Sequence, residues 1–160
     1  MFDVTFRDPG VLSDWELYLE LAEQFPGDPS IPWPPCYRFK MRLVDVDEPV
    51  GGIEFRLSVS QFIVTCAGQL GFGVEPGFRG RRLAARSCRL LVPLARAHGL
   101  EELWLTCVPE NVGSRRACEE AGAVFVEIVD TPPESNMYKE GEVRVCRYRL
   151  PVTLNDRGDG

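Results

Sequence analysis

The segment GFGVEPGFRGRRLAA, residues 71–85, predicts a strand that ends, a tight turn and the start of a helix. Pro76 and Gly77 favour the turn, and apolar residues recur at helical spacing from Leu83 onwards. A glycine and three arginines occupy 79–82, where an ordinary loop would place Asp or Ser to cap the helix. The first amides of a helix are unpaired donors, and the helix dipole favours negative charge there. The turn therefore predicts an anion site, and phosphate is the usual occupant of such sites.

The length and composition of the chain predict one soluble globular domain. Its 160 residues are 44% hydrophobic and 26% charged, which suits a single hydrophobic core; we expect a domain at 1–153 and a disordered tail at 154–160. No apolar run approaches the ~20 residues of a membrane span, and the N-terminus lacks a signal-peptide pattern. We therefore expect a cytoplasmic protein without a membrane partner. The net charge of −6 argues against a nucleic-acid partner, because nucleic-acid binding favours a basic surface.

The cysteines do not form a metal-binding pattern. They number six, are scattered through the chain without a CxxC pair, and are accompanied by a single histidine. This arrangement argues against a zinc site and against a disulfide framework. We expect no metal, and we expect the thiols to be mostly buried and reduced.

The N-terminal region is predicted to contain a short strand, a helix and a stiff loop. The strand is expected at 2–7, and the capping box Ser13–Glu16 predicts a helix that runs to about Gln24. Five prolines between Pro26 and Pro35 then remove backbone donors and fix φ, so we expect a loop without regular structure.

The rest of the chain is predicted to alternate strands with two helices. The first helix, at about 80–97, carries Pro93 on its polar face, which predicts a kink around the core. We interpret His98 as a residue at the end of this helix, not as a catalyst. The second helix follows Asn111 as N-cap and stops at Gly122. The expected strands are 37–46, 50–58, 68–75, 103–108, 123–129 and 143–150.

This order of elements resembles the GNAT superfamily of acyl-CoA-dependent N-acyltransferases, in a bacterial branch of predicted acetyltransferases. GFGVEPGFRGRRLA is similar to the acyl-CoA signature of the family, R/Q-x-x-G-x-G/A, at residues 79–84. PENVGSRRACEEAGAVF, residues 109–125, is similar to its second motif. The resemblance covers about 50–126 well. It implies an α/β fold of the α+β type, with a mixed, mostly antiparallel sheet of about six to seven strands flanked by helices.

The resemblance also implies a place for acetyl-CoA as the acyl donor. The pyrophosphate would bind the amides at the start of the helix, and the arginines of the turn would add charge-assisted hydrogen bonds. The pantetheine arm would lie between splayed strands at 70–75 and 103–108, paired with the amide of Val74. The cofactor-binding residues implied are Phe72, Gly73, Val74, Arg79, Gly80, Arg81, Arg82, Leu83, Ala84, Asn111 and Ser114. The alternative is an ordinary turn with a solvated, arginine-rich face.

Two departures from the family pattern concern the cofactor and the leaving group. Arg82 stands where the signature has glycine. Cys118 stands where many members place a tyrosine that protonates the departing thiolate. A thiol of ordinary pKa, about 8.5, is acidic enough for this task, so Cys118 is either the general acid or a small core residue.

A third departure concerns the base that takes a proton from the amine. Some relatives carry Glu or His where this chain has Gln69, which cannot act as a base but can hold a water. Glu54 is the best substitute, on the polar side of its strand; its alternative role is that of a cross-strand partner of an arginine. Glu75 is expected to point to solvent.

The acceptor is expected to enter beside the proline-rich loop. Trp33, Trp15 and Tyr37 are candidates for an apolar wall, and Asp28 or Glu54 for contact with an ammonium group. Packing within the loop is the alternative for these aromatic residues. We count Trp33 and Gln69 as substrate-binding candidates, and Glu54 and Cys118 as catalytic candidates.

The function implied is an N-acetyltransferase that moves an acetyl group from acetyl-CoA to a primary amine by direct transfer in a ternary complex. The alternative is a CoA-binding regulatory module with weak or no turnover, which the substitutions at 69, 82 and 118 favour. An unrelated nucleotide binder would need a P-loop or GxGxxG motif, and neither is present. The acceptor is expected to be a small-molecule or amino-acid-like amine, with a protein amine as an alternative, and the protein to be a monomer or a homodimer.

Overall fold

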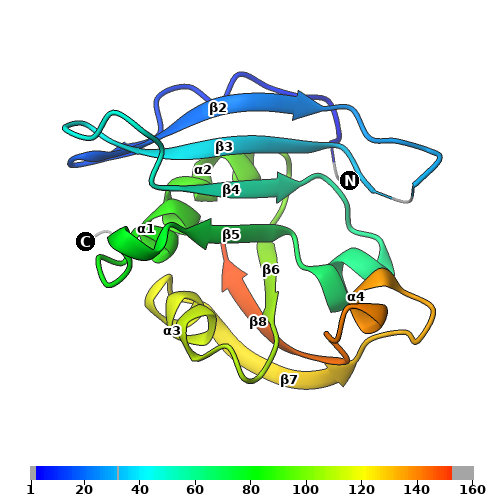
Figure 1. The fold of residues 1–160 in the computed structure, drawn as a ribbon. Coiled ribbons are helices and arrows are strands. Elements are labelled where there is room, and N and C mark those ends of the chain that lie inside the picture. Colours follow the sequence, from blue (N-terminus) through cyan, green and yellow to red (C-terminus); the bar gives the residue numbers. More distant parts are fainter. Residues whose placement is uncertain (1–2, 32, 153–160) are drawn as a thin grey trace.

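The computed structural model describes residues 3–31 and 33–152. Within them the chain forms an eight-stranded sheet in the order β1-β2-β3-β4-β5-β6-β8-β7 (Figure 1). The strands are β1 Ser13–Asp14, β2 Leu17–Phe25, β3 Cys36–Leu43, β4 Gly51–Arg56, β5 Leu70–Val74, β6 Glu102–Cys107, β7 Val124–Asp130 and β8 Arg144–Pro151. The helices are α1 Leu83–Leu90, α2 Val92–Ala97, α3 Val112–Glu120 and α4 Asn136–Lys139, with a π-helix η1 Ile63–Ala67 and a 3₁₀ turn η2 Pro76–Phe78.

The sheet is mixed and mostly antiparallel, as expected, although it has more strands than predicted. Every neighbouring pair is antiparallel except β5 and β6, which run parallel and are joined by a crossover through α1 and α2. Among the described residues these two strands pair in register at Leu70 and Leu105 alone. Beyond that pair they separate, so the predicted splayed strands are confirmed.

The predicted helix at 13–24 is wrong: this segment forms the hairpin of β1 and β2. Leu17 and Leu19 are buried whereas Tyr18 and Glu20 are exposed, which is the two-residue period of a strand. Trp15 lies in the hairpin turn with φ +57. The described part of the predicted strand at 2–7 is also not a strand and runs as irregular chain.

The predicted helix at 80–97 is present but divided in two. It begins at Leu83, and the break falls at Leu91, before the proline. Pro93 thus occupies the first turn of α2, where its missing amide removes no helical hydrogen bond.

The second half of the fold follows the sequence closely. Asn111 caps α3 and Gly122 ends it with φ +98, as predicted. The four strands predicted from 68 onwards are present with ends shifted by one or two residues. Two short elements, η1 and α4, were not predicted. The tail predicted to be disordered, 154–160, lies outside the described residues.

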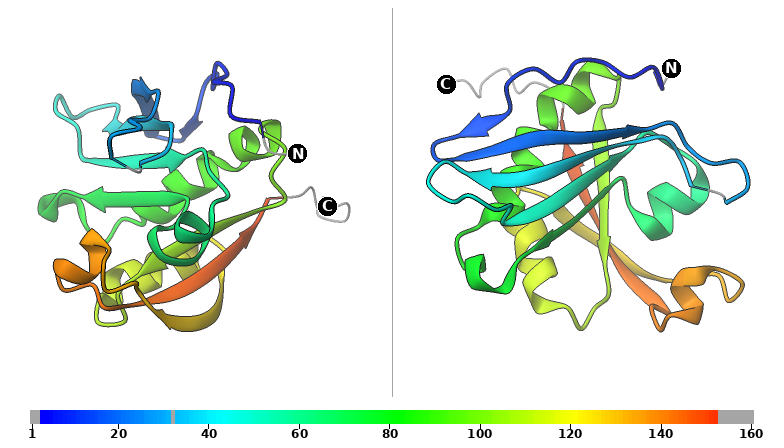
Figure 2. Two further views of the ribbon diagram at one scale, coloured as in Figure 1. Left: turned by 90° about the vertical axis from the view of Figure 1, so that its right-hand side faces the viewer. Right: turned by 45° about the horizontal axis from the view of Figure 1, so that its top comes forward.

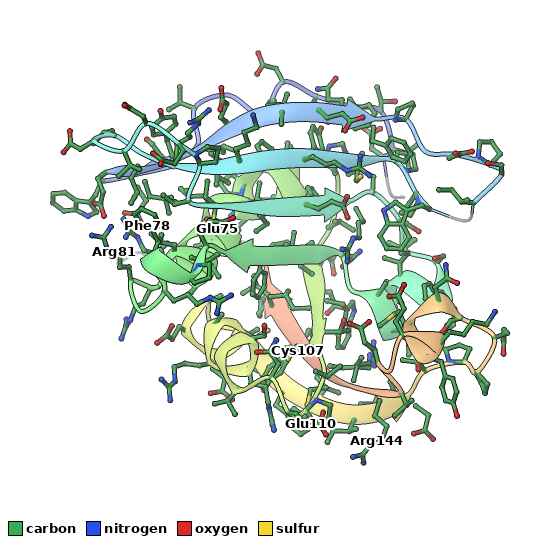
Figure 3. All side chains as sticks on the ribbon, in the orientation of Figure 1. Glu75, Phe78, Arg81, Cys107, Glu110 and Arg144 are labelled. Atoms are coloured by element: carbon green, nitrogen blue, oxygen red, sulfur yellow. The ribbon has the colours of Figure 1, made fainter. Side chains whose placement is uncertain are left out.

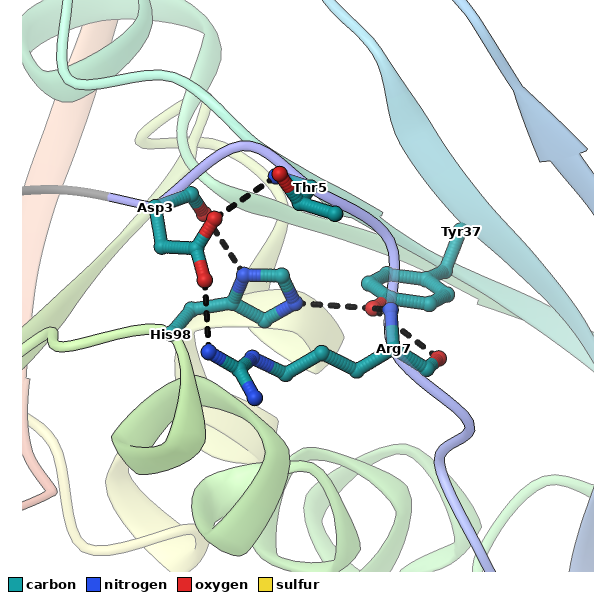
Figure 4. A network of polar contacts seen from close by, with 5 residues as sticks. All are labelled: Asp3, Thr5, Arg7, Tyr37 and His98. Carbon is teal, nitrogen blue, oxygen red and sulfur yellow. Dashed lines mark hydrogen bonds and ion pairs between the residues drawn. The ribbon is translucent and has the colours of Figure 1, made fainter.

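His98 ends α2 and anchors the N-terminal segment to the core (Figure 4). Its Nδ1 lies 2.6 Å from the carbonyl oxygen of Asp3, and its Nε2 lies 2.7 Å from the hydroxyl of the buried Tyr37. The same hydroxyl accepts a hydrogen bond from the amide of Arg7. The N-terminal segment therefore runs over the end of α2, as Figure 2 shows, and His98 has a structural role there.

The six thiols are free and five of them are buried, in agreement with the prediction for the cysteines. Cys107 is the partly exposed one. Among the described residues, no helix has the length and apolar character needed to cross a membrane.

Candidate acyl-CoA cleft

The separation of β5 from β6 opens a cleft of about 690 Å³ between β5, the turn before α1, and α3. Every predicted cofactor-binding residue except Arg81 lines it. Arg81 instead lies over the ring of Phe78, 5.7 Å from its centre. In Figure 3, Glu75, Phe78 and Arg81 gather at the turn, whereas Cys107 lies near the middle of the molecule. The structure thus brings the two sequence motifs together on one cleft.

The start of α1 faces this cleft without a side-chain cap from any described residue. Its first amides are therefore available as donors, and the helix dipole adds positive potential at the same point. Gly80, with φ +89, turns the backbone toward the helix. The arrangement is suited to an anionic group, as the sequence predicts.

Arg82 has a left-handed backbone, with φ +61 and ψ +24. Glycine adopts this conformation without the steric penalty of a Cβ, which is the physical reason for glycine at this position of the signature. The Arg82 side chain is 71% exposed and its Nε lies 3.5 Å from a carboxylate oxygen of Glu120. The side chain therefore leaves the amides of the turn open.

The backbone of β5 presents polar groups to the cleft. The amide of Glu75 donates a hydrogen bond to the carbonyl oxygen of Val50, just before β4. Because the backbone amides of a strand alternate in direction, the amides of Phe72 and Val74 face away from β4, toward the cleft. Arg79 Nε donates to the carbonyl oxygen of Val74 at 3.1 Å on that side. The Arg79 side chain thus fastens the turn to β5.

Asn111 and Ser114 form part of the opposite wall. The side-chain oxygen of Asn111 accepts a hydrogen bond of 3.0 Å from the amide of Ser114 and caps α3. Both residues also line a second cavity of about 350 Å³ that adjoins the first, and Phe72 is common to the two. The two cavities lead from the turn to the region of Trp33 and α4.

Cys118 is fully buried, which favours the core alternative over the general acid. Its thiol hydrogen-bonds to Cys107 and lies in an apolar core, and both effects raise its pKa. The same hydrogen bond lowers the pKa of Cys107 although burial opposes the shift. Cys107 lines the smaller cavity, so it is the thiol that faces the cleft. The sequence offered no signal for this beyond its place at the end of a strand.

Glu54 is held by two arginines and is not free to act as a base. Its carboxylate oxygens lie 2.8 Å from Arg38 Nε and 2.7 Å from Arg56 Nε. Burial opposes ionisation of Glu54, but the hydrogen bonds from both arginines outweigh it and lower the pKa. The structure favours the cross-strand partner of an arginine, the alternative role of this residue.

Gln69 was expected to bind substrate, but its side chain is buried within the protein. It is 1% exposed. Its amide nitrogen donates to the carbonyl of Ser58 at 3.1 Å, and its oxygen accepts from the amide of Trp104 at 2.8 Å. Gln69 therefore ties β6 to the chain after β4, and both of its polar ends are satisfied within the protein.

Of the three aromatic residues predicted to form an apolar wall, one lines a cavity. Trp33 lines the smaller cavity, and the guanidinium of Arg56 lies 4.9 Å from the centre of its ring. Trp15 is 92% exposed on the β1–β2 turn, and Tyr37 is buried beside His98. The carboxylate of Asp28 accepts hydrogen bonds from Ser30 within the loop.

Comparison with known families decides the classification. The sequence profile of the acetyltransferase (GNAT) family matches residues 11–123. The chain belongs to the GNAT family of acetyltransferases. The GNAT resemblance noted in the two sequence motifs is thereby confirmed. A search of curated proteins finds no significant match to the chain.

Solved GNAT structures share the fold at low sequence identity. A probable acetyltransferase from Chromobacterium violaceum has a TM-score of 0.65 and 16% identity, with 100% of this chain and 93% of that chain covered. A putative ribosomal-protein-serine acetyltransferase from Vibrio cholerae has a TM-score of 0.65 and 15% identity, with 91% and 99% covered. The microcin C7 self-immunity acetyltransferase MccE, in complex with acetyl-CoA and AMP, has a TM-score of 0.55 and 10% identity, with 72% and 61% covered. The match thus spans less than two thirds of the MccE chain.

Proposed function

We propose that this protein is an N-acetyltransferase that transfers an acetyl group from acetyl-CoA directly to a primary amine. The observation that carries the proposal is the cleft, where the uncapped start of α1 and the inward-facing amides of β5 share one wall. Membership of the GNAT family supports acetyl-CoA as the donor. MccE, which shares the fold, was crystallised with acetyl-CoA.

In this proposal the pyrophosphate of acetyl-CoA binds the amides of 80–84, and the exposed guanidinium groups of the turn balance its charge. The pantetheine arm extends along β5 and pairs with the amide of Val74. Its thioester reaches the region where the two cavities adjoin, near Phe72 and Ser114.

The proposed reaction is attack of the neutral amine on the thioester carbonyl. The carbonyl oxygen becomes an oxyanion, and the amide of Phe72, which points into the cleft, is our candidate donor to it. The carbon–sulfur bond then breaks, CoA departs as a thiolate, and the amine loses its proton to water. A side-chain base is not required at a pH where part of the amine is already neutral.

A CoA-binding module with weak turnover is the second candidate. Two observations favour it: the carboxylate of Glu54 is occupied by two arginines, and Cys118 is buried. Neither residue is then available for proton transfer. Both candidates require the same donor site, so binding and turnover must be measured separately.

The test of the donor site is isothermal titration of acetyl-CoA and CoA into wild type and Ala84→Glu. Ala84 lines the cleft in the first turn of α1, so the new carboxylate repels the pyrophosphate. We expect micromolar binding by wild type and at least a tenfold loss in the variant. Ala97→Glu adds the same charge on the exposed end of α2 and is the matched control.

Turnover is then followed as thiol release with a panel of primary amines. Release that depends on the amine supports the acetyltransferase, whereas binding without release supports the regulatory module. Failure of wild type to bind either ligand contradicts both. Circular dichroism of each variant confirms that it has folded.

A further inference from the structure

Arg56, the last residue of β4, is held rigidly at the wall of the smaller cavity. Its Nε donates to Glu54 at 2.7 Å, and its Nη1 donates to the carbonyl oxygens of Ala67 and Gly68 at 2.8 and 3.0 Å. Trp33 covers one face of the guanidinium. The side chain is 14% exposed, so its orientation is fixed by the protein.

The remaining nitrogen, Nη2, has no hydrogen-bond acceptor among the described residues. A guanidinium carries five N–H donors and does not lose its charge at physiological pH. The bonds above use three of them, so the two on Nη2 remain. These N–H groups face the cavity that Arg56 lines, so an oxygen of a bound ligand can accept hydrogen bonds from them there.

Gly71 makes room for this nitrogen. It lies opposite Glu54 in the β4–β5 register, and a Cβ at this position would clash with Arg56 Nη2. Gly71 lines the same cavity. Absence of a side chain at 71 therefore keeps Nη2 at the cavity surface, beside the splayed end of β5.

The cavity has the size and charge for a small zwitterion. Its volume of about 350 Å³ is at the lower end of small-molecule sites. Arg56 lines it on one side, and the exposed Glu142 also lines it. A carboxylate accepts a charge-assisted hydrogen bond from a guanidinium N–H, and such a bond is stronger than one to a neutral acceptor.

We propose that Arg56 Nη2 binds a carboxylate of the acceptor, and that the acceptor is a small amine of the amino-acid class. This inference rests on the proposed function, since it names the acceptor for the same cleft. Gly71 acts as a positioning residue, because it sets the place of the guanidinium without touching the acceptor's charge. Trp33 closes the far side of the guanidinium.

The experiment compares amino acids with their C-terminal carboxamides, which keep the amine and lose the carboxylate. Each pair is titrated into protein saturated with CoA, and, where turnover is seen, kcat/KM is measured as well. For wild type we expect the acid to bind at least tenfold more tightly than its amide. In Arg56→Gln this preference falls to about one.

Two further variants separate recognition from folding. Gly71→Ala displaces the guanidinium without removing its charge, and we expect it to lose most of the preference. Arg38→Gln removes the other arginine on Glu54, outside the cavity, and we expect it to keep the preference. Thermal melting shows whether each variant is folded.

Equal affinity of wild type for acids and amides would overturn the inference, as would weak or undetectable binding of every acid in the panel. A preference that survives in both Arg56→Gln and Gly71→Ala would overturn it too. CoA affinity is measured first in each protein. If wild type does not bind CoA, the proposed function is contradicted. If wild type binds CoA but does not prefer amino acids to their carboxamides, this inference alone is contradicted.

Discussion

Arg82 carries a backbone conformation that costs a residue with a Cβ about 1–2 kcal/mol, and its exposed ion pair with Glu120 returns little of that free energy. We therefore expect Arg82→Gly to raise the free energy of unfolding by about 1 kcal/mol, measured by urea denaturation. Glu120→Gln, which removes the ion pair and leaves the backbone unchanged, is the control and is expected to have little effect. A less stable Arg82→Gly would mean that the arginine side chain contributes more than its backbone costs.

We expect Cys107 to be the most reactive of the six thiols. The hydrogen bond from Cys118 lowers its pKa, and it lines a cavity while the other five cysteines are buried. Since the thiolate is the nucleophile, iodoacetamide is expected to alkylate Cys107 first, as peptide mass spectrometry would show.

The cause of this reactivity is tested with Cys118→Ala. Loss of the hydrogen bond raises the pKa of Cys107, so alkylation at neutral pH slows and its pH midpoint moves upward. The control is Cys66→Ala, because Cys66 lines neither cavity. An unchanged midpoint in Cys118→Ala would exclude this hydrogen bond as the cause.

At the scale of elements, α3 depends on its cap. Asn111→Ala removes the acceptor for the amide of Ser114 and is expected to lower the free energy of unfolding by about 1 kcal/mol. Since Asn111 and Ser114 both line the cleft, acetyl-CoA affinity should also fall. Asn111→Asp keeps an acceptor at the cap and should retain stability. Equal stability of all three proteins in urea would contradict this role.

Local sequence patterns predicted correctly those features that are set by residues close together in the sequence. The cap at Asn111, the stop at Gly122 and the turn at 76–82 are all set within a few residues. The segment 13–24 carried two opposing patterns, a capping box and a period of two from Leu17. Pairing of β2 with β3 satisfies its backbone and buries one face, so the tertiary environment selected the strand.

At the scale of the whole molecule, ionisation of Glu54, a residue of β4, makes the free energy of unfolding depend on pH. Its pKa is lowered in the folded state from the ordinary value of 4.5, by the hydrogen bonds that outweigh burial. The stability it contributes is therefore fully present above that ordinary value and is lost as the pH falls through the folded pKa.

Glu54→Gln is accordingly expected to be less stable than wild type at pH 7, because Arg56 loses its carboxylate partner. Below the ordinary value of 4.5 the difference should shrink as the pH falls, because wild type takes up the proton. Thermal midpoints measured across this range check both statements. The control is Glu23→Gln, which removes the exposed carboxylate that pairs with Arg38. A difference independent of pH would contradict the linkage.

The sequence by itself determined the two motifs of the cleft and the elements around them, because turns, caps and hydrophobic periods are local properties of the chain. The family and the mixed sheet were predicted from the resemblance that those two motifs carry. Tertiary structure alone decided which side chains face that cleft. Gln69 became a strand tie and Cys118 a core residue, whereas Cys107 and Arg56 reached the cavity. These outcomes depend on strand register and on contacts between segments far apart in the chain, such as Gly71 beside Arg56, and a linear pattern does not encode them.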